Sequence, residues 1–175
     1  MLTTTRTLND AALINFLFAG DAIFTLVNEA TGTRYTYRVN KKGYQYTDRQ
    51  GKLVEGTCYW VSLLTGPQNT SDYTYLGSLK SETQRTFALS PKSRIESDQL
   101  GSVQAISWLL RRIELFEAGQ KSTVMVGLVF YHAGRCGRCA RVLTTPESCN
   151  AGIGPECSGR QVKGITKPVK MKVIG

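Results

Sequence analysis

The sequence predicts an α+β fold, in which a small antiparallel sheet and two helices are followed by a cysteine-rich module near the C-terminus. Three observations predict it. Two segments repeat apolar residues every three or four positions, as amphipathic helices do. Several short runs rich in Val, Thr and Tyr are separated by turns that contain Gly, Asn or Pro, as the strands of hairpins are. Four of the five cysteines and the only histidine fall within residues 132–157.

The two helices are expected near the start of the chain and in its second half. Residues 7–10 have the composition of a helix start, and Gly20 is the expected stop. The clearest helical pattern covers residues 100–118 and is followed by Gly119, which suits a helix end. The apolar stripes are Leu13, Ile14, Leu17 and Phe18 in the first helix and Val103, Ile106, Leu109, Leu110, Ile113 and Phe116 in the second.

The strands are expected in hairpin pairs ahead of the second helix, with one more strand after it. They cover residues 22–28, 34–39, 58–64, 73–79, 86–89 and 123–131. Lys41-Lys42-Gly43 predicts a turn after the second strand. Cys58, within a strand-like run, is expected to be a buried core thiol.

The length of 175 residues suits one domain with a small appended module. We expect an α+β domain over residues 1–120, a zinc-binding module over residues 121–159 and a flexible basic tail over residues 160–175. No run approaches the roughly 18–20 apolar residues of a membrane span, and the N-terminus lacks the pattern of a secretory signal peptide. We therefore expect a cytoplasmic protein without a membrane partner.

The net charge of +9 is concentrated in the last third of the chain. Residues 1–120 carry 13 Lys and Arg against 11 Asp and Glu, whereas residues 121–175 carry nine against two. A positive field of this kind attracts polyanions or an acidic protein surface. The charge therefore indicates the kind of partner but not which of the two it is.

The histidine and the clustered cysteines are spaced as metal ligands. In a reducing cytosol, a Cys-x-x-Cys pair indicates metal binding rather than a disulfide, so Cys136 and Cys139 are expected ligands of a structural Zn²⁺. Cys157 is the expected third ligand. The fourth is either His132, which would complete a Cys₃His shell, or Cys149. Four protein ligands close the shell, so metal-assisted hydrolysis is not expected.

The run Cys-Gly-Arg-Cys-Ala-Arg-Val-Leu-Thr-Thr-Pro-Glu-Ser, followed by Gly-Ile-Gly-Pro-Glu-Cys, resembles a family of unknown function common in phage and mobile-element proteins. The resemblance covers residues 136–157 and implies a zinc-ribbon-like module, located in the host cytoplasm if the protein is phage-encoded. Ala140 stands where the family pattern has Gly. Cys149 stands where the pattern has an aliphatic residue, which favours His132 as the fourth ligand.

Basic residues around the cysteines favour a nucleic-acid-binding function. The expected phosphate contacts are Arg135, Arg138, Arg141, Arg160, Lys163 and Lys167. The alternative is a protein-interaction module that inhibits or modulates a host protein, for example a defence protein. In that case the same basic face would contact an acidic surface of the host protein. No phosphate-binding glycine loop occurs, and one histidine on zinc leaves none for a catalytic triad. We therefore expect no enzymatic activity.

Seven of the eight tyrosines fall between residues 35 and 75, and six of them form i, i+2 pairs. Members of such a pair share one face of a strand. Together with nearby basic residues they could form a stacking platform for a single-stranded nucleic acid. Ordinary cross-strand pairing in a sheet explains them as well and is the interpretation that we favour.

Overall fold

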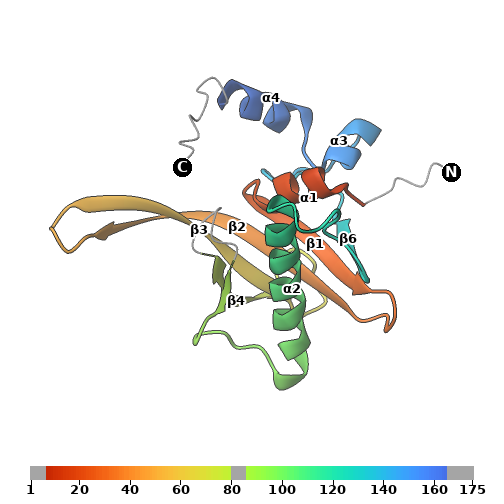
Figure 1. The fold of residues 1–175 in the computed structure, drawn as a ribbon, viewed down its shortest axis with the longest axis horizontal. Coiled ribbons are helices and arrows are strands. Elements are labelled where there is room, and N and C mark those ends of the chain that lie inside the picture. The colour runs from red at the N-terminus through yellow and green to blue at the C-terminus, as the bar shows by residue number, and fades with distance from the viewer. Residues whose placement is uncertain (1–6, 80–85, 165–175) are drawn as a thin grey trace.

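The computed structural model describes residues 7–79 and 86–164, with side chains up to residue 159, and these form one antiparallel sheet with helices packed against it (Figure 1). The six strands lie in the order β5-β4-β3-β2-β1-β6. Strands β1 to β5 are neighbours in chain order, and β6 returns from the far part of the chain to pair with β1. The α+β fold with an antiparallel sheet is therefore confirmed.

The structure places the elements as follows. The strands are β1 Asp21–Asn28, β2 Arg34–Thr47, β3 Leu53–Leu64, β4 Tyr73–Leu79, β5 Phe87–Leu89 and β6 Leu128–His132. The helices are α1 Asp10–Leu17, α2 Leu100–Glu117, α3 Pro146–Ala151 and α4 Pro155–Gly164, with a 3-10 turn at Ser97–Gln99. Both expected helices are present. Within the described residues, no helix is long and apolar enough to span a membrane.

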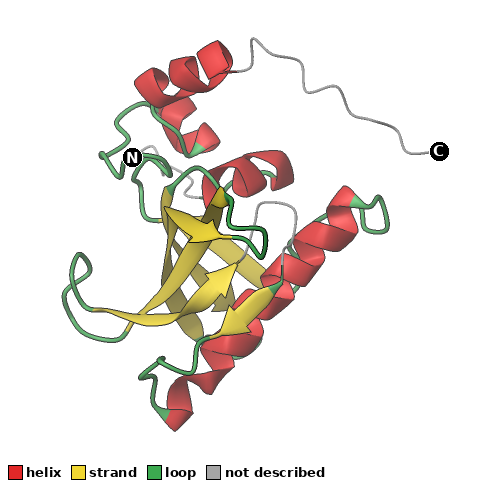
Figure 2. Ribbon diagram, turned by 90° about the vertical axis from the view of Figure 1, so that its left-hand side faces the viewer, coloured by secondary structure: helices red, strands yellow, loops and turns green. Residues whose placement is uncertain are grey.

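The hydrophobic core lies between one face of the sheet and the helices α1 and α2. In β1, the buried residues Ala22, Phe24 and Leu26 alternate with less buried ones, as expected of a strand with one covered face. The apolar stripe of α2 is buried against this face, and Figure 2 shows α2 lying along one side of the sheet. The buried Tyr37 hydroxyl donates a 2.6 Å hydrogen bond to the Ser102 carbonyl. This bond anchors the start of α2 on the sheet.

The opposite side of the sheet, here called the open face, carries no helix of the described residues (Figure 2). Its side chains are the alternate residues that do not enter the core. Thr25 and Thr36 share a 2.8 Å hydrogen bond across β1 and β2, and Arg38 forms a 2.8 Å ion pair with Asp21. The open face therefore carries polar and aromatic side chains, together with a few aliphatic ones such as Ile23, Val27 and Leu64.

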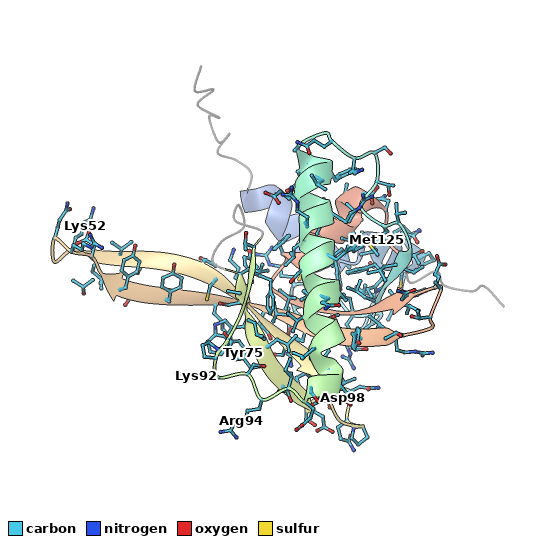
Figure 3. All side chains as sticks on the ribbon, turned by 60° about the horizontal axis from the view of Figure 1, so that its bottom comes forward. Lys52, Tyr75, Lys92, Arg94, Asp98 and Met125 are labelled. Atoms are coloured by element: carbon cyan, nitrogen blue, oxygen red, sulfur yellow. The ribbon has the colours of Figure 1, made fainter. Side chains whose placement is uncertain are left out.

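The hairpin of β2 and β3 extends beyond the rest of the sheet as an arm, with Lys52 at its tip (Figures 1 and 3). Pairing continues from Asn40 opposite Trp60 out to Thr47 opposite Leu53. The expected turn at residues 41–43 is therefore wrong, because cross-strand pairing with β3 keeps this segment extended. The true turn follows Asp48, whose carboxylate accepts hydrogen bonds from two backbone N–H groups of the turn.

Two other expectations also differ from the structure. The strand expected over residues 123–131 begins only at Leu128, because residues 123–127 form a loop whose Val124 is buried in the core. Arg112 holds this loop by donating to the carbonyls of Thr123 and Val124. Cys58 is half-buried on the open face rather than in the core, since its partner across the strands is Lys42.

Candidate metal centre

Three cysteine side chains converge near the C-terminal end of the described chain. The sulfur atoms of Cys136, Cys139 and Cys157 all lie within 4.8 Å of one another. Cys136 and Cys157 are buried, whereas Cys139 is exposed. Thiolates bound tetrahedrally at about 2.3 Å from a zinc ion lie roughly 3.8 Å apart. The three thiols are therefore close enough together to hold a metal ion.

Cys136 and Cys139 lie in a tight turn at the end of β6. The Ala140 N–H donates a 2.9 Å hydrogen bond to the Cys136 carbonyl, and the Cys136 N–H donates to the Arg141 carbonyl at 2.8 Å. Ala140 has a φ of 59°, the one positive φ at a non-glycine residue in the described chain. This left-handed conformation suits glycine better than alanine, because glycine has no Cβ.

Cys157 comes from the first turn of α4. Pro155 opens this helix, and its fixed φ suits the first helical position. The helix start faces the cluster, because the N–H of Gly154 donates a 3.4 Å hydrogen bond to the Cys136 sulfur. The partial positive charge at this helix N-terminus therefore lies beside the Cys136 sulfur and favours its thiolate.

The short helix α3 connects the two halves of the cluster. The Thr145 hydroxyl accepts a hydrogen bond from the Ser148 N–H, Pro146 opens the helix, and Gly152 ends it with a φ of 69°. Neither α3 nor α4 was expected from the sequence. A Thr-Pro start followed by glycine six residues later is a helix signature, and it was the signal that could have identified α3.

The cysteine module is joined to the sheet by backbone contacts and by one aromatic ring. The Asp21 N–H donates to the Gly137 carbonyl at 2.7 Å. A Cβ at Gly137 would lie 2.6 Å from the Phe16 ring, and one at Gly152 would lie 2.7 Å from it. The ring of α1 thus packs directly on two glycines of the module. The module expected from residue 121 onward includes β6, and β6 is also a strand of the sheet because it pairs with β1.

The environment of the thiols shifts their pKa values in opposite directions. Burial alone would raise the pKa of Cys136, but hydrogen bonds from the N–H groups of Gly154, Arg138 and Cys139, together with the Cys139 side chain, lower it below its ordinary value. Burial, together with the contacts of its thiol with Cys139 and Cys136, raises the pKa of Cys157 to about 11. Without metal, Cys157 keeps its proton near neutral pH, so binding of a metal by its thiolate must release that proton.

The fourth predicted ligand is not part of this group of three. His132 is buried at the end of β6, and its Nδ1 accepts a 3.0 Å hydrogen bond from the Gly134 N–H. A neutral imidazole can bind a metal only through a nitrogen that carries no proton. Binding through Nδ1 would displace this hydrogen bond, and binding through Nε2 would put the proton on Nδ1. Metal binding through either nitrogen therefore breaks the hydrogen bond from the Gly134 N–H.

The rival ligand, Cys149, is also outside the group of three. Its thiol is buried in the small core of the module, where it faces the Leu143 carbonyl at 3.8 Å. This core consists of Cys136, Leu143, Cys149, Ile153 and Cys157. The identity of the fourth ligand therefore stays a prediction.

Three of the predicted phosphate-binding residues surround the cluster. Arg135 donates to the Ala140 carbonyl at 3.0 Å, and Arg138 donates to the Cys157 carbonyl at 3.4 Å. Arg141 forms an exposed ion pair with Glu156 at 3.1 Å. Residues 160 and 163 lie in the last turns of α4, beyond the described side chains, and Lys167 lies outside the described residues, as does the tail from residue 165.

Comparison with known proteins identifies a similarity confined to this region. A family model described as a family of unknown function, DUF6011, matches residues 127–162. No curated protein and no solved structure matches the chain. The matched residues include β6 and all three clustered cysteines. The similarity is therefore to a family of unknown function, over the part of the chain that could hold a metal ion.

Proposed function

We propose that this chain is a zinc-stabilised, non-catalytic nucleic-acid-binding protein of the phage or mobile-element type. One observation carries the proposal: within the described residues, Arg135 and Arg138 are held at the cysteine cluster by carbonyl oxygens and pair with no carboxylate. Their positive charge is oriented but not neutralised. A guanidinium held in this way keeps donors for a phosphate, which it can bind through two parallel hydrogen bonds.

Zinc is the metal that fits this cluster best. Three cysteine sulfurs are soft ligands, which favour zinc over the hard cations that prefer oxygen ligands. We expect His132 to complete the shell after exchanging its hydrogen bond from Gly134 for the metal. A shell of four protein ligands has no position for substrate, so the ion would act on structure rather than on chemistry. Its role would be to hold the arginines of the module in place.

Native mass spectrometry tests the metal part of the proposal. The wild-type protein is expected to carry one zinc ion, and Cys136→Ser or Cys139→Ser should lose it because each removes a clustered thiol. His132→Ala should weaken zinc retention, whereas Cys149→Ser should not. Zinc retained by His132→Ala and lost by Cys149→Ser would show that the fourth ligand is Cys149. A metal-free wild-type protein after purification with added zinc would contradict the proposal.

Fluorescence anisotropy with labelled oligonucleotides tests the binding part. Binding is expected to weaken steeply as salt increases, because phosphate contacts release counterions. Arg135→Gln and Arg138→Gln should each reduce the salt slope by about one. Arg111→Gln is the matched control, because Arg111 is an exposed cation on α2, which covers the other face of the sheet. No binding at low salt would overturn the proposal and favour the protein-interaction alternative.

A further inference from the structure

We propose that the open face of the sheet is a binding platform for a single-stranded nucleic acid, with bases stacked on its aromatic rings and phosphates beside its basic side chains. The inference rests on the proposed nucleic-acid-binding function and specifies the class of ligand and the surface. It depends on the strand register, the placement of the rings, the shape of the face and its charge.

Strand register places aromatic and basic side chains of four strands on the same face. Along β2, every second residue from Arg34 to Tyr46 points to the open face, because successive side chains of a strand alternate. Tyr131 of β6 joins them, since it pairs with Thr25, which pairs with Thr36. The aromatic and basic residues of this face are Arg34, Arg38, Lys42, Tyr44, Tyr46, Trp60, Tyr73, Tyr75 and Tyr131.

The same register removes two tyrosines from the platform that the sequence suggested. Tyr35 and Tyr37 alternate with the open-face residues and point toward α2. Tyr37 is fully buried there, and the hydroxyl of Tyr35 lies against Gly101 of α2. These two rings belong to the core side, so cross-strand packing explains them and stacking on a ligand does not.

The rings of the open face are arranged to offer flat surface to a ligand. Tyr44 lies across Gly56 of the neighbouring strand, because a Cβ at Gly56 would lie only 2.4 Å from the ring. The rings of Tyr44 and Tyr46 are nearly parallel, with an interplanar angle of 27° and centroids 6.0 Å apart. Both side chains are more than 40% exposed, at 43% and 49%. Glycine at position 56 thus lets a tyrosine ring lie on the sheet rather than stand away from it.

A second aromatic group lies at the base of the arm. Trp60 is 47% exposed, and its ring centroid is 5.5 Å from that of Tyr75. The Lys42 ammonium lies 5.5 Å from the centroid of the same indole ring. A large exposed indole beside a cation is the combination that binds a base and its phosphate together.

The open face is also hollowed near the cysteine module. A groove of about 700 Å³ lies over β1 and β2, between Tyr131 on one side and Tyr73 on the other. Arg34 and Arg135 line it, so an arginine of the module borders the same groove as an arginine of the sheet. The groove therefore connects the aromatic face with the basic region around the cysteine cluster.

The charge of this surface fits a polyanion. The carboxylate of Asp21 is occupied by Arg38 and by the Asn40 amide, each at 2.8 Å. Within the described residues, Arg34 and Lys42 form no ion pair, which leaves their charge available. Exposed rings favour a single strand over a duplex, because duplex bases are already stacked and paired.

Tryptophan fluorescence provides a direct test, because the chain has two tryptophans and only Trp60 lies on the open face. In Trp108→Phe, Trp60 is the remaining fluorophore, and a single-stranded oligothymidine is expected to quench it as bases stack. In Trp60→Phe, the remaining Trp108 on α2 should show little quenching. Binding by anisotropy without quenching in Trp108→Phe would overturn the inference.

Affinity measurements on the full chain provide the second test. Trp60→Ala and Tyr131→Ala should each weaken single-strand binding roughly tenfold, with duplex binding much less affected. Trp60→Phe and Tyr131→Phe keep an aromatic ring and should retain most of the affinity. Thermal melting must show that all four variants stay folded.

The outcomes separate this inference from the proposed function. If both alanine variants bind single strands as wild type does while Arg135→Gln and Arg138→Gln weaken binding, the platform is wrong and the nucleic-acid function stands. If the wild-type protein binds no oligonucleotide at low salt, the proposed function fails, and the inference fails with it.

Discussion

The sheet and the cysteine module are stabilised by different means, although they share one strand. One face of the sheet and the helices α1 and α2 share a core of 19 buried residues. The module has a core of five buried residues, three of which are cysteines. Two of these, Cys136 and Cys157, belong to the cluster and would become metal ligands. Burying apolar surface therefore stabilises the sheet, whereas the module has too small a core to be stable without its metal or its neighbour. This difference predicts that the two regions respond differently to the same perturbation.

The largest expected effect is that of zinc removal. Chelation should locally unfold the segment between Cys136 and Cys157, because the metal is proposed to hold its loops. The sheet should keep its fold. Hydrogen exchange measured by mass spectrometry should show loss of protection over α3 and the start of α4, with β1 to β4 unchanged. Equal loss over both regions would contradict the difference between them.

A core substitution should produce the reverse pattern. Phe24 is fully buried, and its ring stacks on Phe130 and Tyr37 at 4.6 and 5.4 Å. Phe24→Ala is expected to cost about 3–5 kcal/mol of unfolding free energy, because it leaves a cavity in the core. Urea denaturation would measure this loss, and native mass spectrometry at low temperature should still find zinc on the folded fraction. Stability within about 1 kcal/mol of wild type would show that the core is assigned wrongly.

Substitution at the contact between the two regions should have an intermediate effect. A methyl group at Gly137 would lie 2.6 Å from the Phe16 ring and 2.8 Å from its carbonyl oxygen. Gly137→Ala is therefore expected to destabilise the protein by about 1–3 kcal/mol through overpacking. Gly159→Ala is the matched control, because a Cβ there meets nothing within 4 Å. Equal melting temperatures for the two variants would contradict the close contact.

The smallest expected effect is a gain in stability within the module. Ala140 adopts a left-handed conformation that costs a residue with a side chain about 1–2 kcal/mol relative to glycine. Ala140→Gly should therefore raise zinc affinity or thermal stability by about 1 kcal/mol or less, since glycine also loses more entropy on folding. A competition titration with a chromogenic zinc chelator measures the change. Weaker zinc binding in this variant would contradict the account of the turn.

Local patterns were enough to predict some elements but not others. The helix at α2 and the strand at β1 follow from apolar periodicity, which acts over neighbouring residues. The arm was missed because Lys41-Lys42-Gly43 has the composition of a turn, yet pairing with β3 keeps it extended. The packing of Phe16 on Gly137 was also invisible, because these residues are far apart in sequence and only the fold brings them together.

The candidate site shows the same division. Spacing identified Cys136, Cys139 and Cys157, which the fold does bring together. Spacing could not decide between His132 and Cys149, since that choice depends on which side chain can reach the cluster. The open face could not be assigned either, because the turn expected at residues 41–43 interrupts the register that aligns Tyr44 with Arg38 and Arg34.

The central claim is that a metal ion holds a basic module beside the open face of a sheet that binds nucleic acid. Anisotropy of a labelled single-stranded oligonucleotide, measured with zinc-loaded protein, with chelated protein and after zinc is restored, tests it most directly. We expect chelation to weaken binding and added zinc to restore it, while the sheet stays folded by circular dichroism. Equal affinity of the zinc-loaded and chelated proteins would contradict the claim.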